Sequence, residues 1–340
     1  MEIYLIGLAV ALVGGLLMSR LTRLLHLPAV TAYLVAGLLL GPFFLGRLNV
    51  PGLGFNTLEE VNVLSIVSQT ALGFIAFAMG NEFRLSQLRT IGSRAIIIGI
   101  LQAVITTIVV DVILLLLHLF FPHIISVPCA ITLGAIAAAT APAATLMVVR
   151  QYKADGPMTR LLMLVVALDD AVGLLLFSVS FGIATALSNG QVSVLAVVVE
   201  PIVEILLSVG LGGFMGLLLH WVERFFHSRS KRMSLSVAFV MLTVGLSMLE
   251  FQIGPVHCGF SLLLVCMMTG TIFCNVCPTS EELMERVDGW TMPLNILFFV
   301  ISGAELDLNV LSQPVTLIVG IIYIIAVSYT HLRAHETVLD

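Results

Sequence analysis

The chain has 340 residues, of which 59% are hydrophobic and only 10% are charged. A soluble domain is usually about 45–50% apolar and about 25% charged, so this composition excludes an ordinary soluble protein and indicates an integral membrane protein. The formal net charge of −5 also gives no sign of a basic surface for nucleic acid.

Apolar segments that could span a membrane recur along the whole chain, since a spanning helix needs about 20 mainly apolar residues. The eleven predicted spans are 3–19, 28–47, 60–81, 95–121, 126–149, 160–187, 200–222, 233–250, 257–276, 291–309 and 313–328. The first runs into Arg20 and Arg23 without a small-residue cleavage site, so we interpret it as a helix rather than a cleavable signal. The five cysteines lie in or beside spans, and no disulfide framework is expected.

Basic side chains gather in alternate connections between the predicted spans. These connections contain Arg20, Arg23, Arg84, Arg89, Arg94, Arg150, Lys153, Arg160, Arg224, Arg229, Lys231, Arg232 and Arg286. The other connections contain only Arg47. Because short loops rich in Lys and Arg stay on the cytoplasmic side, the pattern predicts that the N-terminus lies outside. We expect the protein to lie in a bacterial-type inner (cell) membrane.

Two neighbouring acids, Asp169 and Asp170, interrupt the apolar run VVALDDAVGL (165–174). Asp170 lies about 15 Å beyond Arg160 at 1.5 Å per residue, which is about half of a 30 Å hydrocarbon core. An ionised carboxylate at that depth is costly, so an intramembrane acid is a functional hypothesis by default. Burial and like-charge repulsion should both favour the protonated form, and the pair should titrate as one coupled unit. A purely structural role is the less favoured interpretation of this pair.

The preceding span contains the run AIAAATAPAATLMVV, with Pro142 near its middle. A proline removes one backbone donor and clashes with the carbonyl four residues back, which frees the carbonyl of Ala138. Thr140 adds a hydroxyl at a depth that matches Asp170. Carboxylate, hydroxyl and carbonyl oxygens suit a small hard cation, and they can bind it in competition with a proton. A proline in a membrane helix can also be only a kink, and that alternative stays open for Pro142 alone.

Other polar residues have simpler explanations. We interpret Asp111, in the span 95–121, as a neutral, hydrogen-bonded structural group. Close helix packing explains the small-residue stretches AGLLLGP (36–42) and VGLGGFMG (209–216). CNVC (274–277) is a lone CxxC pair, for which a metal or redox role is not favoured. Exposed helix ends explain Glu82, Glu305 and Asp307, and also His118, His123, His220, His227 and His257, whose spacing suggests no metal site.

The end of the chain departs from this pattern, because PVTLIVGIIYIIAV is followed by the abruptly polar SYTHLRAHETVLD. A native helix could end at Val327, but the tail after it shows neither a capping signal nor a helical period. Residues 328–340 are therefore predicted to be non-native and the chain to be truncated.

Several of these stretches resemble the monovalent cation:proton antiporter superfamily, and most closely its sodium(potassium)/hydrogen exchanger and Kef-type members. The likeness rests on LPAVTAYLVAGLLLGP (27–42), ALGFIAFAMGNEFRLSQLR (71–89), TAPAATLMVVRQYKADGPMTRLLMLVVALDDAVGLLLF (140–177) and PLNILFFVISGAELDL (293–308). The run from the TxP motif to the paired aspartates is the most specific part. The resemblance implies an all-α polytopic membrane protein with the antiporter fold, inverted repeats and a broken core helix, of which about 11 of an expected 13 transmembrane helices are present.

The resemblance also implies a division of the chain. Its segments are 1–92 (dimerisation scaffold), 93–190 (core ion-transport helices), 191–232 (bridging helix), 233–310 (scaffold) and 311–327 (start of the second core repeat). Asp170 matches the principal carboxylate that binds cation and proton, Asp169 matches its neighbour, and Thr140 and Pro142 match the first broken helix. The expected basic partner would follow GIIYIIA, where Arg333 is not a convincing substitute, and the second broken helix is missing. We therefore expect this chain as written to transport poorly.

The implied function is the exchange of Na⁺ or K⁺ for protons by alternating access, in a homodimer, with no cofactor besides the transported ions. One alternative is a Kef-type potassium efflux system. A remote alternative is an intramembrane aspartyl protease, but that chemistry needs acids on two facing helices, whereas Asp169 and Asp170 are consecutive. Enzymatic activity is not expected.

Overall fold

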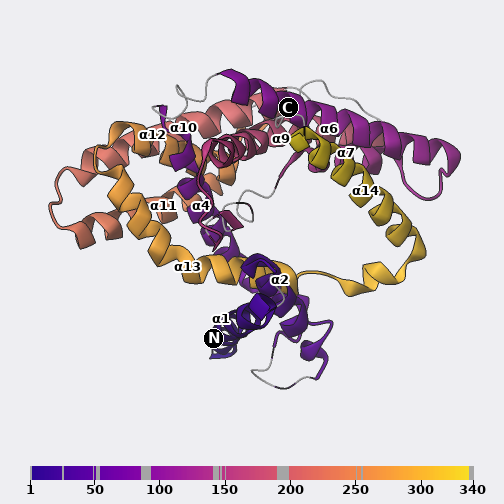
Figure 1. The fold of residues 1–340 in the computed structure, drawn as a ribbon, viewed down its shortest axis with the longest axis horizontal. Helices are drawn as coiled ribbons and strands as arrows, with labels where there is room; N and C mark the ends of the chain where they lie inside the picture. The colour runs from indigo at the N-terminus through magenta and orange to yellow at the C-terminus, as the bar shows by residue number, and fades with distance from the viewer. Residues whose placement is uncertain are drawn as a thin grey trace.

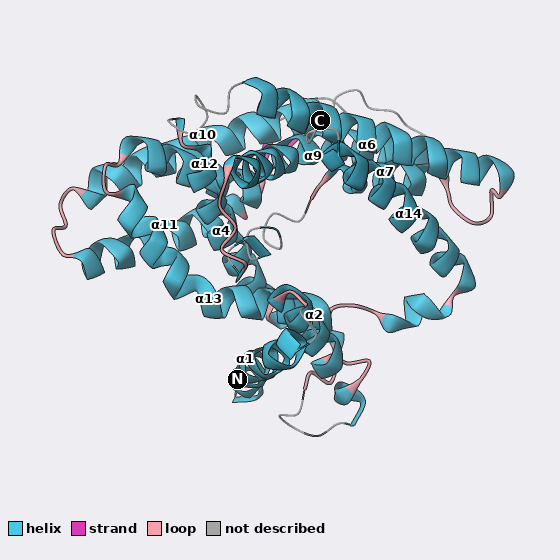
Figure 2. Ribbon diagram, viewed as in Figure 1, coloured by secondary structure: helices cyan, strands magenta, loops and turns pink. Residues whose placement is uncertain are grey.

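The computed structural model describes residues 2–24, 27–48, 50, 54–85, 93–140, 145, 148–149, 151–189, 199–249, 251–253 and 256–336. Helices make up nearly all of this part of the chain (Figure 2). They are α1 (Glu2–Leu24), α2 (Ala29–Leu40), α3 (Leu58–Val63), α4 (Ser65–Gly80), α6 (Ser93–Phe120), α7 (Val127–Ala138), α9 (Pro157–Asn189), α10 (Glu200–Glu223), α11 (Arg229–Ser247), α12 (Leu262–Val276), α13 (Ser280–Ala304) and α14 (Pro314–Glu336). The 3₁₀ turns are η1 (Leu45–Leu48), η2 (Asn81–Phe83) and η4 (Leu308–Ser312).

The helices follow the predicted spans in order, which confirms a polytopic helical membrane protein. Among the described residues, five helical segments are long and apolar enough to cross a membrane: Tyr4–Thr22, Ala29–Leu48, Ile96–Phe120, Ile202–Glu223 and Ser280–Ala304. Shorter apolar helices cover Ser65–Gly80, Val127–Ala138, Leu262–Val276 and Pro314–Thr330. Continuous apolar helices are expected here, because backbone groups inside a bilayer must find their hydrogen-bond partners within the protein.

Two predicted starts were wrong. The span predicted at 257–276 begins only at Leu262, because β1 (Phe251–Ile253) and β2 (Val256–Cys258) form a short antiparallel hairpin. The span predicted at 291–309 instead runs from Ser280 to Ala304. Its polar first turn carries Glu281 and Glu282, and negative charge stabilises a helix N-terminus.

The last predicted span, 313–328, was also too short at its end, because α14 continues to Glu336. The apolar part of α14 supplies the helical nucleus, and adding residues to an existing helix is far easier than starting one. Leu, Arg, Ala and Glu within the polar extension are all good helix formers. The origin of residues 328–340 stays a prediction.

The helices pack in two groups (Figure 1). In the first group, α13 packs against α1, α2 and α4, while α12 packs against α4 and α10. In the second group, α6, α7 and α9 pack against one another and α14 packs on α6. The contacts of α9 with α10 and η2 connect the two groups. The assignment of these groups to a dimerisation scaffold and a transport core stays a prediction.

Glycines allow the closest helix crossings, as the small-residue stretches predict. A side chain at Gly37 of α2 would overlap the backbone carbonyl of Val300 on α13, and one at Gly303 would overlap that of Leu34. In VGLGGFMG, Gly212 and Gly216 of α10 contact the backbone of α12 in the same way. Small residues let membrane helices approach closely and gain van der Waals contact.

Candidate ion-binding site

The helix that contains the TxP motif is interrupted where the sequence predicts. α7 begins with the hydroxyl of Ser126 capping the backbone N–H of Cys129, and it ends at Ala138. Ala139 has extended dihedrals (φ −75°, ψ 131°), and its N–H turns back to the carbonyl of Ile136 at 3.2 Å. The chain is helical again at Thr145. Pro142 lies outside the described residues, but Ala138 is the residue whose carbonyl a proline at 142 would displace.

The paired acids lie within α9, opposite this interruption. Asp169 is fully buried, with 0% of its surface exposed. Asp170 occupies the next position of the same helix, and its side chain lies outside the described part of the chain. Asp169 is thus buried within the protein, not exposed at its surface.

Gly173 places the acids beside the break. A Cβ built at Gly173 would lie 3.3 Å from the Cβ of Ala139, 3.4 Å from its Cα and 3.5 Å from its nitrogen. Residues three and four apart share a face of a helix, so the positions of Asp170 and Asp169 lie one turn from this contact. On the other side, a Cβ at Gly99 of α6 would lie 3.3 Å from the Cβ of Leu168. The acid-bearing turn of α9 is therefore held between α6 and the interrupted α7. Sequence reasoning missed Gly173, although a glycine one turn after an acid pair is a usable signal.

Thr140 contributes a polar atom to the interruption. Its Oγ1 is buried and makes no hydrogen bond within the described residues. A buried hydroxyl without a partner costs about 1–3 kcal/mol, so such a group usually has a ligand or a functional reason. Thr140 is one residue from Ala139, which contacts Gly173. The hydroxyl thus lies at the break that faces the acid-bearing helix.

Asp111 of α6 packs against α7 at a point away from the break. Its Oδ1 occupies the space that a side chain at Gly134 would fill, and this oxygen has no hydrogen-bond partner in the described structure. The sequence-based expectation that Asp111 is hydrogen-bonded therefore finds no support at this oxygen. Gly134 is more than a helical turn before the end of α7 at Ala138, so Asp111 is not part of the break.

The remaining predicted groups lie at helix ends. Asp307 accepts a hydrogen bond from the N–H of Asn309 at 2.8 Å and caps η4, and Glu305 is exposed at the end of α13. Arg333 belongs to the helical backbone of α14, and its side chain lies outside the described atoms. α14 packs on α6 through Val319, Ile322 and Tyr323.

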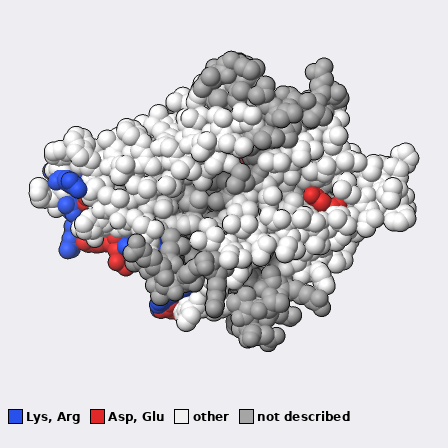
Figure 3. All heavy atoms as spheres, turned by 90° about the horizontal axis from the view of Figure 1, so that it is seen from above, with Lys and Arg blue, Asp and Glu red and all other residues white. Residues whose placement is uncertain are grey.

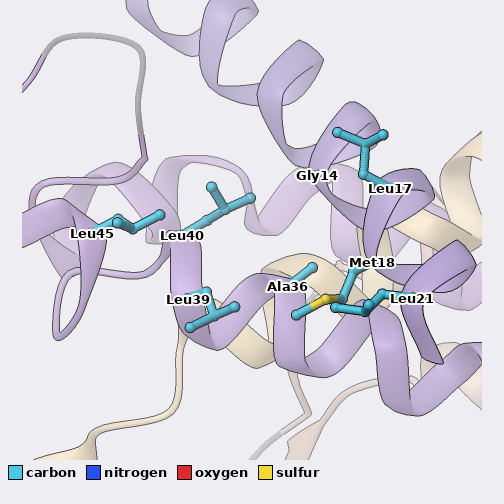
Figure 4. Close-up of a pocket in the computed structure, with 8 residues that line it drawn as sticks. All are labelled: Gly14, Leu17, Met18, Leu21, Ala36, Leu39, Leu40 and Leu45. Atoms are coloured by element: carbon cyan, nitrogen blue, oxygen red, sulfur yellow. The ribbon is translucent and has the colours of Figure 1, made fainter. Parts of the chain in front are cut away.

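An apolar pocket of about 260 Å³ lies between α1, α2 and η1 (Figure 4). It is lined by Gly14, Leu17, Met18, Leu21, Ala36, Leu39, Leu40 and Leu45. These side chains offer no oxygen, nitrogen or charge to an ion. The pocket is therefore unsuited to cation binding, and the break near Asp169 stays the better candidate.

A family model described as "Sodium/hydrogen exchanger, transmembrane" matches residues 8–335. The match extends into the segment that the sequence predicts to be non-native. A stretch of 94 residues is 31% identical to K(+) efflux antiporter 5 of Arabidopsis thaliana. This alignment covers 28% of the chain and only 14% of the plant protein, so it compares one segment.

Solved structures share the fold. The sodium proton antiporter MjNhaP1 from Methanocaldococcus jannaschii at pH 8 superposes with a TM-score of 0.66 at 20% identity, over 96% of this chain and 77% of that one. A second MjNhaP1 structure, from an electron microscopy map, also has a TM-score of 0.66, at 19% identity over 88% of this chain and 69% of that one. The path of the chain through its helices is therefore that of a solved antiporter.

Proposed function

The chain belongs to the sodium/hydrogen exchanger family, and we propose that it exchanges a monovalent cation for protons at a site formed by Asp169, Asp170 and the interruption of α7. The single observation that carries this proposal is the contact of Gly173 with Ala139. It holds the turn of α9 that bears both acids against the non-helical backbone of a neighbouring helix. Family membership supports cation and proton exchange, and this contact supports the location.

The chemistry follows from the groups near the break. A carboxylate away from water stays ionised only if a positive charge balances it, so it binds either a cation or a proton. The hydroxyl of Thr140 and the carbonyl of Ala138 are hard oxygen donors that suit Na⁺ or K⁺. A cation that enters therefore displaces protons from the acid pair, and protons that return displace the cation. Two acids allow two protons per cation, and the exchange requires no cofactor besides the transported ions.

Coupling requires that the site open to one side of the membrane at a time. In this proposal the group of α6, α7, α9 and α14 moves against α1, α2, α4 and α11–α13, and α10 bridges the two groups. The second group acts as the scaffold and forms a homodimer within the bilayer. The protein lies in a bacterial-type inner membrane, with its N-terminus outside and its basic connections in the cytoplasm.

Potassium is the main alternative cargo. The similarity of a 94-residue segment to a plant K(+) efflux antiporter favours it, whereas the family description favours sodium. Both ions are hard monovalent cations, and the described oxygen donors do not distinguish them. Transport assays with Na⁺, K⁺ and Li⁺ in separate runs decide between the two functions.

The test is exchange by the full-length protein in everted membrane vesicles, followed by dequenching of a fluorescent pH-gradient probe when a cation is added. We expect Asp169→Asn and Asp170→Asn to abolish dequenching, because the amide carries no charge to balance a cation. Asp307→Asn is the matched control, since that acid caps η4 outside the site. Exchange at the wild-type rate in both site variants would refute the assignment.

A further inference from the structure

A second polar cluster lies in the first helix group, at the end of α10. His220 and Glu223 come from the last turns of this helix, and Cys277 follows the end of α12. All three are buried, with 8%, 3% and 3% of their surfaces exposed. One ligand-capable atom from each lies within 4.8 Å of the others. An imidazole, a carboxylate and a thiol thus meet away from the aqueous surface.

Helix packing brings these residues together, although Glu223 and Cys277 are 54 residues apart in the chain. His220 and Glu223 are three residues apart, so both lie on one face of α10. Gly212 and Gly216 let this helix approach α12 closely. Cys277, just beyond Val276, then reaches the face that carries His220 and Glu223.

Neighbouring donors orient the Glu223 carboxylate. Its Oε1 forms an ion pair with Arg232, 3.0 Å from Nε, and accepts a hydrogen bond from Thr279 Oγ1 at 3.2 Å. Its Oε2 accepts the weak hydrogen bond of the Cys277 thiol at 3.5 Å. Arg232 and Thr279 therefore hold Oε1 of Glu223, while Oε2 faces the sulfur of Cys277. Outer-shell hydrogen bonds of this kind are how proteins position metal-binding carboxylates.

His220 is incompletely satisfied. The guanidinium of Arg224 lies 2.7 Å from its Nε2, and because arginine can only donate, Nε2 is the acceptor. The other ring nitrogen, Nδ1, then carries the proton, and it is buried with no hydrogen-bond partner among the described residues. Arg224 itself is exposed, so its side chain can turn to solvent and release Nε2.

We propose that His220, Glu223 and Cys277 form a binding site for a divalent transition-metal ion, with Zn²⁺ the best match, that ties the end of α10 to the connection between α12 and α13. Sulfur, nitrogen and carboxylate oxygen are the ligands that zinc takes in proteins. Three protein ligands leave a fourth position for water. Thiolate and imidazole are poor ligands for Na⁺ or K⁺, so this site is distinct from the proposed exchange site in the other helix group.

Binding rearranges few atoms. In the metal-free protein the Cys277 thiol donates to Glu223 Oε2, so the sulfur carries a proton. A bound ion would form bonds to Cys277 Sγ, to one ring nitrogen of His220 and to the Glu223 carboxylate. The thiol proton would leave to solvent, and the imidazole would keep one proton on its other nitrogen. The thiolate and the carboxylate would bring negative charge to the ion, while Arg232 stays paired with the Glu223 carboxylate at Oε1.

Charged side chains gather in the first turns of α11 and α13. Arg229 and Arg286 both pair with Glu282, at 3.1 and 3.2 Å. Figure 3 shows charged side chains gathered at one end of the visible face, the end at which α11 and α13 begin in Figure 1. Glu223 pairs with Arg232 of α11, so the cluster lies toward this polar end of the helices.

The test is metal binding by the full-length protein in detergent after treatment with a chelator. We expect one Zn²⁺ per chain after desalting, and Co²⁺ in its place should show thiolate-to-cobalt charge-transfer absorption. Cys277→Ser, His220→Gln and Glu223→Gln should each weaken binding at least about tenfold, and Arg224→Gln should bind as tightly as wild type or more tightly. Cys274→Ser is the matched control, because that buried thiol contacts the carbonyl of Gly80 instead.

The wild-type measurement decides even if a variant fails to fold. Substoichiometric zinc, or bound cobalt without the charge-transfer band, would overturn the proposal. So would full binding by Cys277→Ser, loss of binding in Cys274→Ser, or weaker binding by Arg224→Gln. Zinc stoichiometry and cobalt absorption do not depend on transport, so failure of the metal site is distinguishable from failure of the exchange proposal.

Discussion

Replacing Gly173 probes the contact on which the exchange site depends. In Gly173→Ala, the new Cβ would lie 3.3–3.5 Å from three atoms of Ala139. Carbon atoms pack best at about 3.5–4.0 Å, so the two helices must separate by a few tenths of an ångström. Overpacking by a methylene costs about 1–3 kcal/mol, and this mild case lies at the low end. Alanine in place of glycine inside a helix raises the free energy of unfolding by about 0.5–1 kcal/mol.

These two terms nearly cancel, so the melting temperature of Gly173→Ala should stay close to that of the wild type. Binding should change more, because a misplacement of about 1 Å in a preorganised site can cost about 100-fold. A shift of a few tenths of an ångström then predicts a loss of roughly 3- to 10-fold in apparent cation affinity. Gly173→Leu inserts a branched side chain at the same contact and should abolish exchange.

The assay is the cation concentration that gives half-maximal dequenching in everted vesicles, with protein amount matched by immunoblot. Gly213 of α10 provides the control, because a Cβ there meets nothing within 4 Å. Gly213→Ala and Gly213→Leu should therefore transport like the wild type. Wild-type affinity in Gly173→Leu would show that α9 does not lie against the break in the working protein, and the proposed site would be wrong.

Three further substitutions test other parts of the structure. Thr140→Val removes the buried hydroxyl at constant shape and should lower apparent cation affinity about tenfold, as loss of a polar contact to an ion does. Thr140→Ser keeps the hydroxyl and should leave the affinity unchanged. If Thr140→Val and the wild type reach half-maximal dequenching at the same cation concentration, Thr140 is not a ligand. Gly37→Ala should lower the melting temperature relative to Gly213→Ala, at a cost of about 1–3 kcal/mol, because its Cβ would overlap the Val300 carbonyl; an unchanged transition would mean that α2 and α13 cross less closely. Asp111→Asn should retain exchange, since Asp111 lies against Gly134 and not at the break, and a loss of exchange in vesicles would place it in the site.

The order of the helices and the break in α7 were predictable from the sequence. Each membrane helix needs a long apolar run whose backbone bonds to itself, so hydropathy alone reports its existence. The break follows from Pro142 and the small residues before it, because proline acts on the carbonyl four residues earlier. The ends of α13 and α14 were not predictable in the same way, since their polar turns carry no apolar signal.

The sequence by itself therefore determined that this is a helical membrane protein with two adjacent acids inside one span and an interruption in the span before it. Only the tertiary structure decided that Gly173 meets Ala139, and that His220 and Glu223 meet Cys277. The physical reason is the same for both contacts. Which faces of two helices touch depends on how closely their backbones approach and at what crossing angle. That geometry is set by the packing of many side chains at once, so a glycine in the sequence can mark a close approach but does not identify the residue that it meets.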